Sequence, residues 1–269
     1  MNLTIFVFFT LTVPCPFLAR CVLHPMNIKW FKSISSTQKY LINSPPTYRD
    51  TLPVVATTLQ TRGIGRANNT WLSLTGSLSF SYVAPACIAY IDVIGRVRHV
   101  LKDLGVDARC KWPNDVLVSD GVAVHKVCGA LIDRIGGHAV VGIGVNLGYA
   151  CTCTTGCKGC IGIDEHEWCT ESEDGAVDEC QRSCSTTKYK TVSEITGVEI
   201  TPHAFVERYF SVGDPLYAYD LCEYVNYNGE RMAVIDKREL RLKDRNGKVH
   251  VIDPMLYSYD YSGHSILDK

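Results

Sequence analysis

A glycine-bearing loop between two predicted strands is the first segment whose residue types could do chemistry. It runs from Gln60 to Trp71, with Gly63 and Gly65 at its centre and Arg66 directly after them. Glycines let backbone amides approach a phosphate or carboxylate, while Arg66 adds a fixed positive charge and Trp71 an apolar wall. By itself the loop does not separate an anion site from an ordinary turn, which is the more frequent case.

The segment Lys111–Asp115 (KWPND) brings polar side chains to the end of a predicted strand. Pro113 cannot continue a hydrogen-bonded ladder, so the chain turns there and carries Asn114 and Asp115 off the sheet. Asn and Asp are also common local caps of ordinary turns. The unusual feature is the lysine and tryptophan that come directly before the proline.

Two more segments join a polar residue to an apolar strand. Lys126 leads into the apolar run 127–132, and the segment 142–146 (GIGVN) ends a buried strand with Asn146. The ordinary interpretations are a lysine at a solvated strand end and small residues where another backbone comes close. Singly, therefore, none of the four segments settles a function.

Apolar patterns predict the elements that position these segments. Apolar residues recur at helical spacing in 86–104, a helix that Gly105 ends. Further helix starts are indicated by hydroxyl caps at Ser36–Thr37 and at Thr201. Runs rich in apolar and β-branched residues predict strands at 28–34, 53–59, 78–83, 108–112, 116–118, 127–133 and 139–145. This mixture of hairpins and a long helix predicts an α+β domain with a largely antiparallel or mixed sheet.

Changes in composition divide the chain into three parts. Residues 1–25 are interpreted either as an apolar leader or as a misassigned start. Residues 26–212 form the main domain, interrupted at 150–190 by a polar, cysteine-rich insertion. Residues 213–269 contain two alternating runs around Arg245–Gly247 and predict a small β domain.

The composition argues against several classes of function. Hydrophobic residues make up 46% of the 269 residues and charged residues 20%, which suffices for an ordinary core, and the formal net charge is −1. So neutral a chain has no overall attraction to nucleic acid or an anionic membrane. Thirteen cysteines, an odd number, do not form the framework of a small secreted domain, so a cytoplasmic protein is expected. The alternative is an organelle or the secretory route, reached through residues 1–25.

Taken together, the order and spacing of these segments resemble the biotin–protein ligase family. The resemblance rests on Ser36-Thr37-Gln38, the loop 60–71 and the segments 111–115, 126–129 and 142–146, and it covers about 28–146. It implies a eukaryote-like catalytic domain without a DNA-binding domain. The implied fold is class II synthetase-like and α+β, followed by a small SH3-like β domain that the tail 249–269 resembles.

The resemblance implies an enzyme that uses ATP and Mg²⁺ to make biotinyl-5'-AMP and passes biotin to a lysine on the acceptor domain of a carboxylase. The residues implied to bind biotin are Ser36, Thr37, Gln60, Trp71 and Gly129. Those implied to bind ATP and the adenylate are Gly63, Gly65, Arg66, Asn114 and Asn146. Those implied to act in catalysis are Lys126, Arg66, Asp115 and Lys111. No nucleic acid or membrane partner is expected, and the oligomeric state is either a monomer or a weak dimer.

One loop position departs from the family's pattern. The family normally has a basic residue between the two glycines of the loop, where this chain has Ile64. Arg62, on the other side of Gly63, is the candidate substitute. Without a substitute, the adenylate would be held less well.

The cysteine-rich insertion carries a separate hypothesis. Cys151, Cys153, Cys157 and Cys160 have spacings compatible with a tetrahedral zinc site. The alternative is a loop without metal, because only Cys157 and Cys160 form the usual pair with two residues between them.

Two other functions remain open from the sequence. A lipoate–protein ligase or octanoyl transferase would share the fold, although Trp71 and Lys111–Asp115 favour the biotin branch. The second alternative is a non-catalytic, cysteine-rich binding protein that keeps the fold. It is favoured by Ile64, which stands where the family normally has a basic residue.

Overall fold

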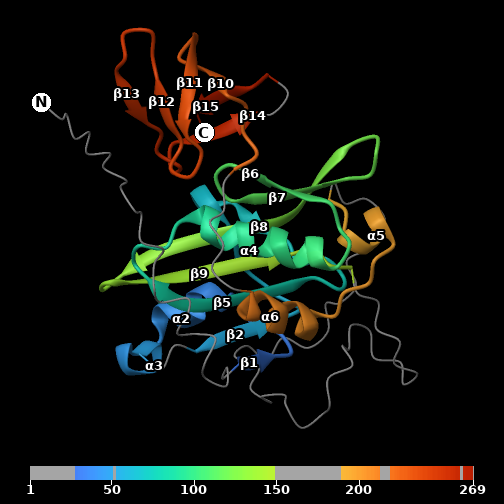
Figure 1. Cartoon of the computed structure of the whole chain (residues 1–269). Coiled ribbons are helices and arrows are strands. Elements are labelled where there is room, and N and C mark those ends of the chain that lie inside the picture. Colours follow the sequence, from blue (N-terminus) through green and yellow to red (C-terminus); the bar gives the residue numbers. More distant parts are fainter. Residues whose placement is uncertain (1–27, 51–52, 149–188, 213–218, 261–262, 269) are drawn as a thin grey trace, which may run out of the picture.

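The computed structural model describes residues 28–50, 53–148, 189–212, 219–260 and 263–268. The first described part is built around a seven-stranded mixed sheet with the order β1-β2-β5-β9-β8-β7-β6 (Figure 1). Its strands are β1 (Ile28–Phe31), β2 (Val54–Thr57), β5 (Leu78–Pro85), β6 (Ala108–Lys111), β7 (Asp115–Ser119), β8 (Val124–Ile135) and β9 (His138–Val145). Only β1 and β2 pair in parallel, and the other neighbours are antiparallel.

Helices and a small hairpin complete this part of the chain. The helices are α2 (Thr37–Asn43), α3 (Pro46–Asp50), α4 (Tyr90–Asp103), α5 (Val192–Thr196) and α6 (Pro202–Ser211). The loop after β2 contains the two-stranded hairpin β3 (Gly63–Ile64) and β4 (Thr70–Trp71), with the 3-10 turn Arg66–Asn68 between them. The Ser36 and Thr201 side chains cap α2 and α6 by accepting from Lys39 N and Ala204 N.

The two faces of the sheet have opposite chemical character, because side chains alternate along a strand. On one face Phe80 and Tyr82 of β5 pack against the aromatic rings of Tyr209 and Phe210 on α6. On the other face Ser81 of β5 contacts Thr37 on α2. Helices α4 and α6 therefore cover an apolar face and α2 covers a face with small and polar residues.

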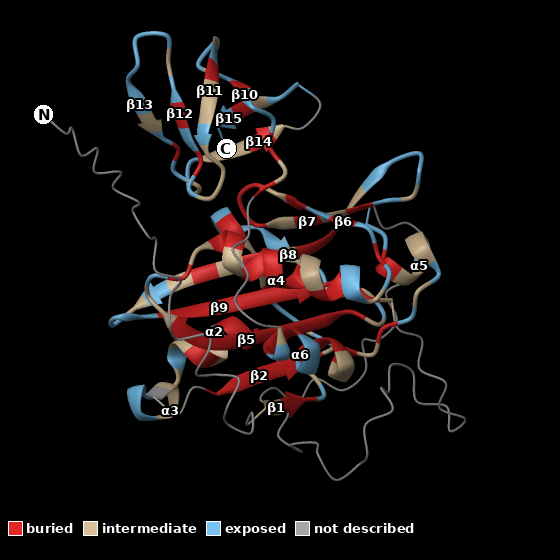
Figure 2. Ribbon diagram, viewed as in Figure 1, coloured by how far each residue is buried: buried red, intermediate tan, exposed pale blue. Residues whose placement is uncertain are grey.

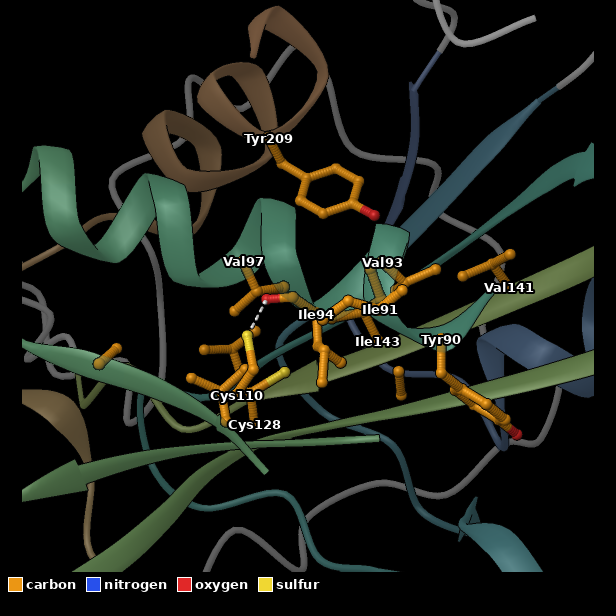
Figure 3. Close-up of a cluster of buried hydrophobic side chains, with 14 of the residues drawn as sticks. Tyr90, Ile91, Val93, Ile94, Val97, Cys110, Cys128, Val141, Ile143 and Tyr209 are labelled. Atoms are coloured by element: carbon orange, nitrogen blue, oxygen red, sulfur yellow. Dashed lines mark hydrogen bonds between the residues drawn. The ribbon is translucent and has the colours of Figure 1, made fainter. Parts of the chain in front are cut away.

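The apolar face holds the main core. Ile91, Ile94 and Val97 of α4 are completely buried against strands of the sheet (Figures 2 and 3). Cys110 lies beside this helix, and its thiol contacts the Ile94 carbonyl at 3.6 Å. Burial raises the pKa of the Cys110 thiol to about 12, so it stays protonated near neutral pH and acts as a packing residue.

A second sheet, with the strand order β13-β12-β11-β10-β15-β14, forms the C-terminal part (Figure 1). Its strands are β10 (Tyr224–Tyr227), β11 (Glu230–Asp236), β12 (Arg241–Lys243), β13 (Val249–Val251), β14 (Tyr257–Asp260) and β15 (Ser265–Asp268). Arg238 pairs with Asp92 of α4 at 2.5 Å, and the Tyr219 hydroxyl donates to the Pro113 carbonyl at 2.6 Å. These contacts join the small β domain to the end of the large sheet that carries β6 and β7.

The structure confirms the predicted α+β class, the mixed sheet and the small C-terminal β domain. The expected boundaries were wrong by three or four residues at three elements: the helix predicted from residue 86 begins at Tyr90, the strand predicted to reach residue 34 ends at Phe31, and the strand predicted from residue 127 begins at Val124. Backbone turns explain the first two, since Ile88 N bonds to Pro85 O and Ile34 leaves the sheet to form a single bridge with Gln60. The third strand is longer because, beyond an irregularity at Val127, it stays paired with β7 as far as Val124. The insertion 150–190 and residues 1–25 lie almost wholly outside the described residues. No helix in the described ranges is long and apolar enough to cross a membrane.

Shortening a side chain in the core should show how much the α4 contact stabilises the domain. Ile94→Ala removes completely buried carbons and should lower the free energy of unfolding by about 2–5 kcal/mol. Val122→Ala is the control, because Val122 is 97% exposed and its loss should change stability by less than about 0.5 kcal/mol. Urea denaturation measures both; equal midpoints for the two variants would contradict the packing described.

Candidate functional site

The floor of the candidate site is the small-residue face of the sheet. Ser79 and Ser81 of β5 pair with Gly144 and Gly142 of β9, and Gly129 of β8 lies opposite Gly144. A Cβ atom on either β9 glycine would collide with a neighbouring side chain. The face is therefore kept nearly free of side chains so that other elements can lie directly on it.

Trp71 is the side chain that occupies most of this floor. A Cβ added to Gly144 would lie 2.2 Å from Trp71 Cε2, and one added to Gly129 would lie 3.0 Å from Trp71 Cζ3. The indole is held there because Trp71 pairs with Gly63 in the hairpin, where a Cβ would approach the Trp71 carbonyl to 2.5 Å. Within the part of the chain that the structure describes, the buried Trp71 Nε1 has no hydrogen-bond partner. Trp71 thus gives the site an apolar wall with one unused donor.

Lys126 reaches the same face because β8 is bulged. The pairing of β7 with β8 skips Val127, so Lys126 lies opposite Leu117 while Cys128 lies opposite Val116. A bulge reverses the alternation of side chains, which turns Lys126 toward the site and leaves Cys128 in the core. The Lys126 ammonium lies 2.8 Å from Asp115 Oδ1 and 5.8 Å from the centroid of the Trp71 ring. A lysine, a carboxylate and an aromatic wall therefore meet at one place.

Arg66 approaches from the loop and is held by two groups. Its Nη1 donates to Asn114 Oδ1 at 2.7 Å, and its guanidinium lies 5.4 Å from the centroid of the Tyr90 ring. Asn114 is itself fixed, because its Nδ2 donates to the Ala130 carbonyl at 2.9 Å. Arg66 Nε and Nη2 are buried and have no hydrogen-bond partner among the described residues. Two donors on a cation are therefore free to bind an anion.

The burial of Arg66 has an electrostatic consequence. Desolvation lowers the pKa of the guanidinium from its ordinary value, and the nearby Tyr90 and Asp115 oppose that shift. An arginine keeps its charge despite such a shift. A buried cation with unused donors attracts an anion more strongly than a hydrated cation does.

The other end of the floor is a network of neutral polar groups. Gln60 Oε1 accepts from the Thr37 amide at 2.9 Å, and Gln60 Nε2 donates to Ser79 Oγ at 3.2 Å. Ser73 Oγ accepts from the Gln60 amide at 3.0 Å. Ser36 is buried and caps α2 directly before Thr37. This end presents uncharged donors and acceptors, in contrast to the cationic end around Lys126 and Arg66.

The remaining predicted site residues lie around this floor with fewer contacts. Asn146 is buried. Its side-chain Oδ1 accepts from Ser77 Oγ at 3.3 Å, and its backbone N–H donates to the Val127 carbonyl at 2.8 Å. Lys111 ends β6 opposite Asp115, and no described residue forms an ion pair with it. Gly65 leaves room for the Asn69 carbonyl, 3.4 Å from where its Cβ would be.

The two loop residues around Gly63 differ in burial. Ile64 is half-buried in β3, whereas Arg62 is exposed and donates only its backbone amide, to the Ser35 carbonyl. No described group holds the Arg62 guanidinium toward Arg66. Its role as a substitute for the missing basic residue therefore stays a prediction.

Three residues of the site were not predicted as part of it. Gln38 and Ser81 extend the polar network, and Tyr90 supports Arg66. The alternation of Ser79 and Ser81 with aromatic residues was visible in the sequence and could have marked a polar face. The expectation that small residues in 142–146 admit another backbone was wrong, since the side chains of Gln38 and Trp71 approach them.

The zinc hypothesis falls outside the structure. Cys151, Cys153, Cys157 and Cys160 are not among the described residues. Within the described ranges, no group of three or more His, Cys, Asp or Glu side chains could hold a metal ion.

Comparison with known proteins agrees with this arrangement. Residues 30–149 match the biotin/lipoate A/B protein ligase family. The structure is similar to a biotin protein ligase from Aquifex aeolicus in complex with biotin and ATP, with a TM-score of 0.53, 20% sequence identity and coverage of 90% of this chain and 99% of that chain. It is also similar to a biotin acetyl coenzyme A carboxylase synthetase from Helicobacter pylori with bound biotinylated ATP, with a TM-score of 0.52, 18% identity and coverage of 85% and 100%.

The matched residues contain the whole floor, the loop with Arg66 and Trp71, and the ion pair of Lys126 with Asp115. At 18–20% identity, the likeness to the two solved structures concerns the fold. The match to the biotin/lipoate A/B protein ligase family thus covers the residues that build the candidate site, and the chain has the fold of the biotin protein ligases.

Proposed function

We propose that the chain is an ATP-dependent biotin–protein ligase. It joins biotin to AMP as biotinyl-5'-AMP and transfers the biotinyl group to a lysine on the acceptor domain of a biotin-dependent carboxylase. Both similar structures named above are described with biotin or biotinylated ATP. The relation in fold supports the same ligands here.

The observation that carries this proposal is the polarity of one continuous floor. Gln60 and Thr37 offer neutral donors and acceptors at one end, while Lys126 and Arg66 offer positive charge at the other. Trp71 lies along the glycines between them. Biotin matches these three regions in the same order: its ureido ring is neutral and polar, its middle is apolar, and its carboxylate is negative and suits the cationic end.

The first step is attack of the biotin carboxylate on the α-phosphate of ATP. A carboxylate oxygen forms the new bond to phosphorus and pyrophosphate leaves with the electron pair of the broken bond. Negative charge on the phosphoryl oxygens is stabilised by fixed cations in a site of low dielectric constant. Arg66 supplies two unused donors for this role, and Lys126 bridges the carboxylate and the phosphate.

The second step transfers the biotinyl group. The acceptor lysine, as a neutral amine, attacks the acyl carbon, and AMP leaves with the electrons of the mixed-anhydride bond. Asp115 is the carboxylate beside Lys126, so it can orient the amine or accept its proton. Lys111, opposite Asp115 and without an ion-pair partner among the described residues, is placed to hold the nucleotide.

The fit of Mg²⁺ to this chain follows from its ligands. Mg²⁺ binds in such sites through substrate phosphates, water and one or two carboxylates, so a dedicated cluster of protein ligands is not needed. Asp115 is the carboxylate of the described site that could contact it, and the metal would neutralise phosphate charge. Asn146, Asn114 and the loop glycines would hold the nucleotide itself.

The family name leaves lipoate as the alternative substrate. Lipoate carries a dithiolane ring, which offers no N–H group to the polar end of the floor. We favour biotin because that end is built from Gln60, Thr37 and Ser79 rather than from apolar side chains. A cytoplasmic location fits the thiols of Cys128 and Cys222, which form no disulfide.

The direct test of the first step is pyrophosphate release from MgATP with biotin and, separately, with lipoate. Release with biotin and recovery of biotinyl-5'-AMP are the expected results. Pyrophosphate release with lipoate but not with biotin would assign lipoate as the substrate. Release with neither acid would contradict the proposal of a ligase.

Lys126→Ala should reduce adenylate formation by at least about 10²–10³-fold, because the cation beside the reacting groups is lost. Lys190→Ala is a matched control, since Lys190 also forms an ion pair at 2.8 Å, with Asp120 at the β7–β8 turn. Pyrophosphate release and circular dichroism are measured on both. Near-normal turnover of Lys126→Ala would remove this lysine from the mechanism.

Gly144→Ala should weaken biotin binding while leaving the rest of the fold intact. The new methyl group would lie 2.2 Å from Trp71 Cε2, so the indole must leave its position on the floor. Overpacking of this kind costs about 1–3 kcal/mol, which corresponds to roughly 5- to 150-fold weaker binding. Calorimetric titration with biotin measures the change, and unaltered affinity would show that Trp71 does not line the ligand.

Ile64→Arg should slow the release of biotinyl-5'-AMP. The substitution restores the positive charge that the family's loop normally carries between the two glycines, and a charged hydrogen bond contributes about 1.5–3 kcal/mol. Dissociation is followed by chasing pre-formed adenylate with excess unlabelled biotin. Identical dissociation rates would mean that Arg62 or another group already makes the contact.

A further inference from the structure

We propose that Gln38 determines which head group the site accepts, by holding the Thr37 hydroxyl as a hydrogen-bond acceptor. This inference rests on the proposed function, because it concerns the polar end of the same floor. Gln38 is on α2, is 3% exposed and has no assigned part in the reaction. Gln38 would act on Thr37 indirectly, because Ser81 hydrogen-bonds to both of these side chains.

The orientation of the Gln38 amide is fixed by its partners. Nε2 lies 2.9 Å from Asp133 Oδ2 and 2.9 Å from the Val140 carbonyl, and both of these oxygens act as acceptors. The nitrogen must therefore face them, and Oε1 must face the opposite way. Gly142 makes this possible, because a Cβ there would lie 2.5 Å from Gln38 Oε1.

The direction of the next hydrogen bond follows. Oε1 can only accept, and Ser81 Oγ lies 3.2 Å from it and donates its single proton. Thr37 Oγ1 is 2.8 Å from the same Ser81 oxygen. Since the Ser81 proton is already committed to Gln38, the Thr37 hydroxyl must be the donor in that contact.

Thr37 has one hydroxyl proton and two oxygens close enough to receive it. Ser81 Oγ is at 2.8 Å and Gln60 Oε1 at 3.2 Å, and Gln60 Oε1 already accepts from the Thr37 amide at 2.9 Å. The Ser81 proton points to Gln38, so the Thr37–Ser81 contact has a proton only if Thr37 donates it, and the Thr37 proton therefore goes to Ser81. The lone pairs of Thr37 Oγ1 are then left to accept from a ligand.

The chemistry of the ligand is thereby restricted. A head group that donates an N–H to Thr37 fits, as a cyclic urea does, whereas a ring oxygen or sulfur at that position faces another acceptor. A buried site built for an N–H discriminates strongly against an analogue that lacks it. Thr37 is 2% exposed, so the side chains that cover it must move aside when a ring enters.

Equilibrium binding without ATP tests this inference apart from catalysis. The ligands are biotin and its two cyclic-carbamate analogues, in which oxygen replaces one or the other ring N–H without a change in shape. The unmodified chain should bind one of the two analogues at least about tenfold more weakly than biotin. Gln38→Met should reduce that ratio to less than about threefold, because Ser81 becomes free to donate to Thr37 and Thr37 to the ligand.

Two further variants keep the result interpretable. Ser81→Ala breaks the same chain with little change in volume and should also lower the ratio, which covers a failure of Gln38→Met to fold. Lys39→Met, an exposed position on the same helix, should keep the ratio of the unmodified chain.

The outcomes separate this inference from the proposed function. An unmodified chain that does not bind biotin would overturn both. A chain that binds biotin but keeps the same ratio in Gln38→Met and Ser81→Ala would overturn only the role of Gln38. A uniform loss of affinity for all three ligands would show a structural role and would likewise contradict it.

Discussion

The close contact between Trp71 and the backbone of β9 is the constraint on which the site depends. An indole can lie directly on a sheet only where the strands beneath it carry no side chains, and Gly144 and Gly129 supply that space. The same requirement recurs two residues along β9, where Gly142 admits Gln38. Because side chains alternate, the neighbouring residues Val141 and Ile143 of the same strand can still pack in the core on the opposite face. One strand therefore stabilises the domain on one face and forms the floor of the site on the other.

Charge is introduced onto this floor by local departures from regular structure. The bulge at Val127 turns Lys126 toward Asp115, and the hairpin with its 3-10 turn carries Arg66 to Asn114. Arg66 is held by Asn114, which is itself fixed by the Ala130 carbonyl, and Lys126 is held by its ion pair with Asp115, so both cations are in place when a phosphate or carboxylate arrives. That arrangement suits a reaction in which position and electrostatics supply most of the catalysis and no protein nucleophile takes part.

Much of the fold was predictable because its patterns are local. The spacing of apolar residues predicted α4, and the hydroxyl cap at Thr201 predicted the start of α6. Most of the residues predicted for the site lie in short motifs, and the structure brings them together on one face of the sheet; their roles stay predictions. The partners that orient them were not, because the contacts of Gln38 with Asp133 and of Arg66 with Tyr90 join distant segments. The bulge at Val127 was equally hidden, as 126–132 reads like an uninterrupted strand.

The most direct measurement of the central claim is the intact mass of a carboxylase biotin-acceptor domain after incubation with this chain, MgATP, and biotin or lipoate. The floor of Trp71 over glycines, with neutral polar groups at one end and cations at the other, predicts the addition of one biotinyl group that requires ATP. A shift with lipoate only would contradict the assignment of biotin. An unchanged acceptor mass, with the chain folded and biotin bound, would contradict the account of a ligase.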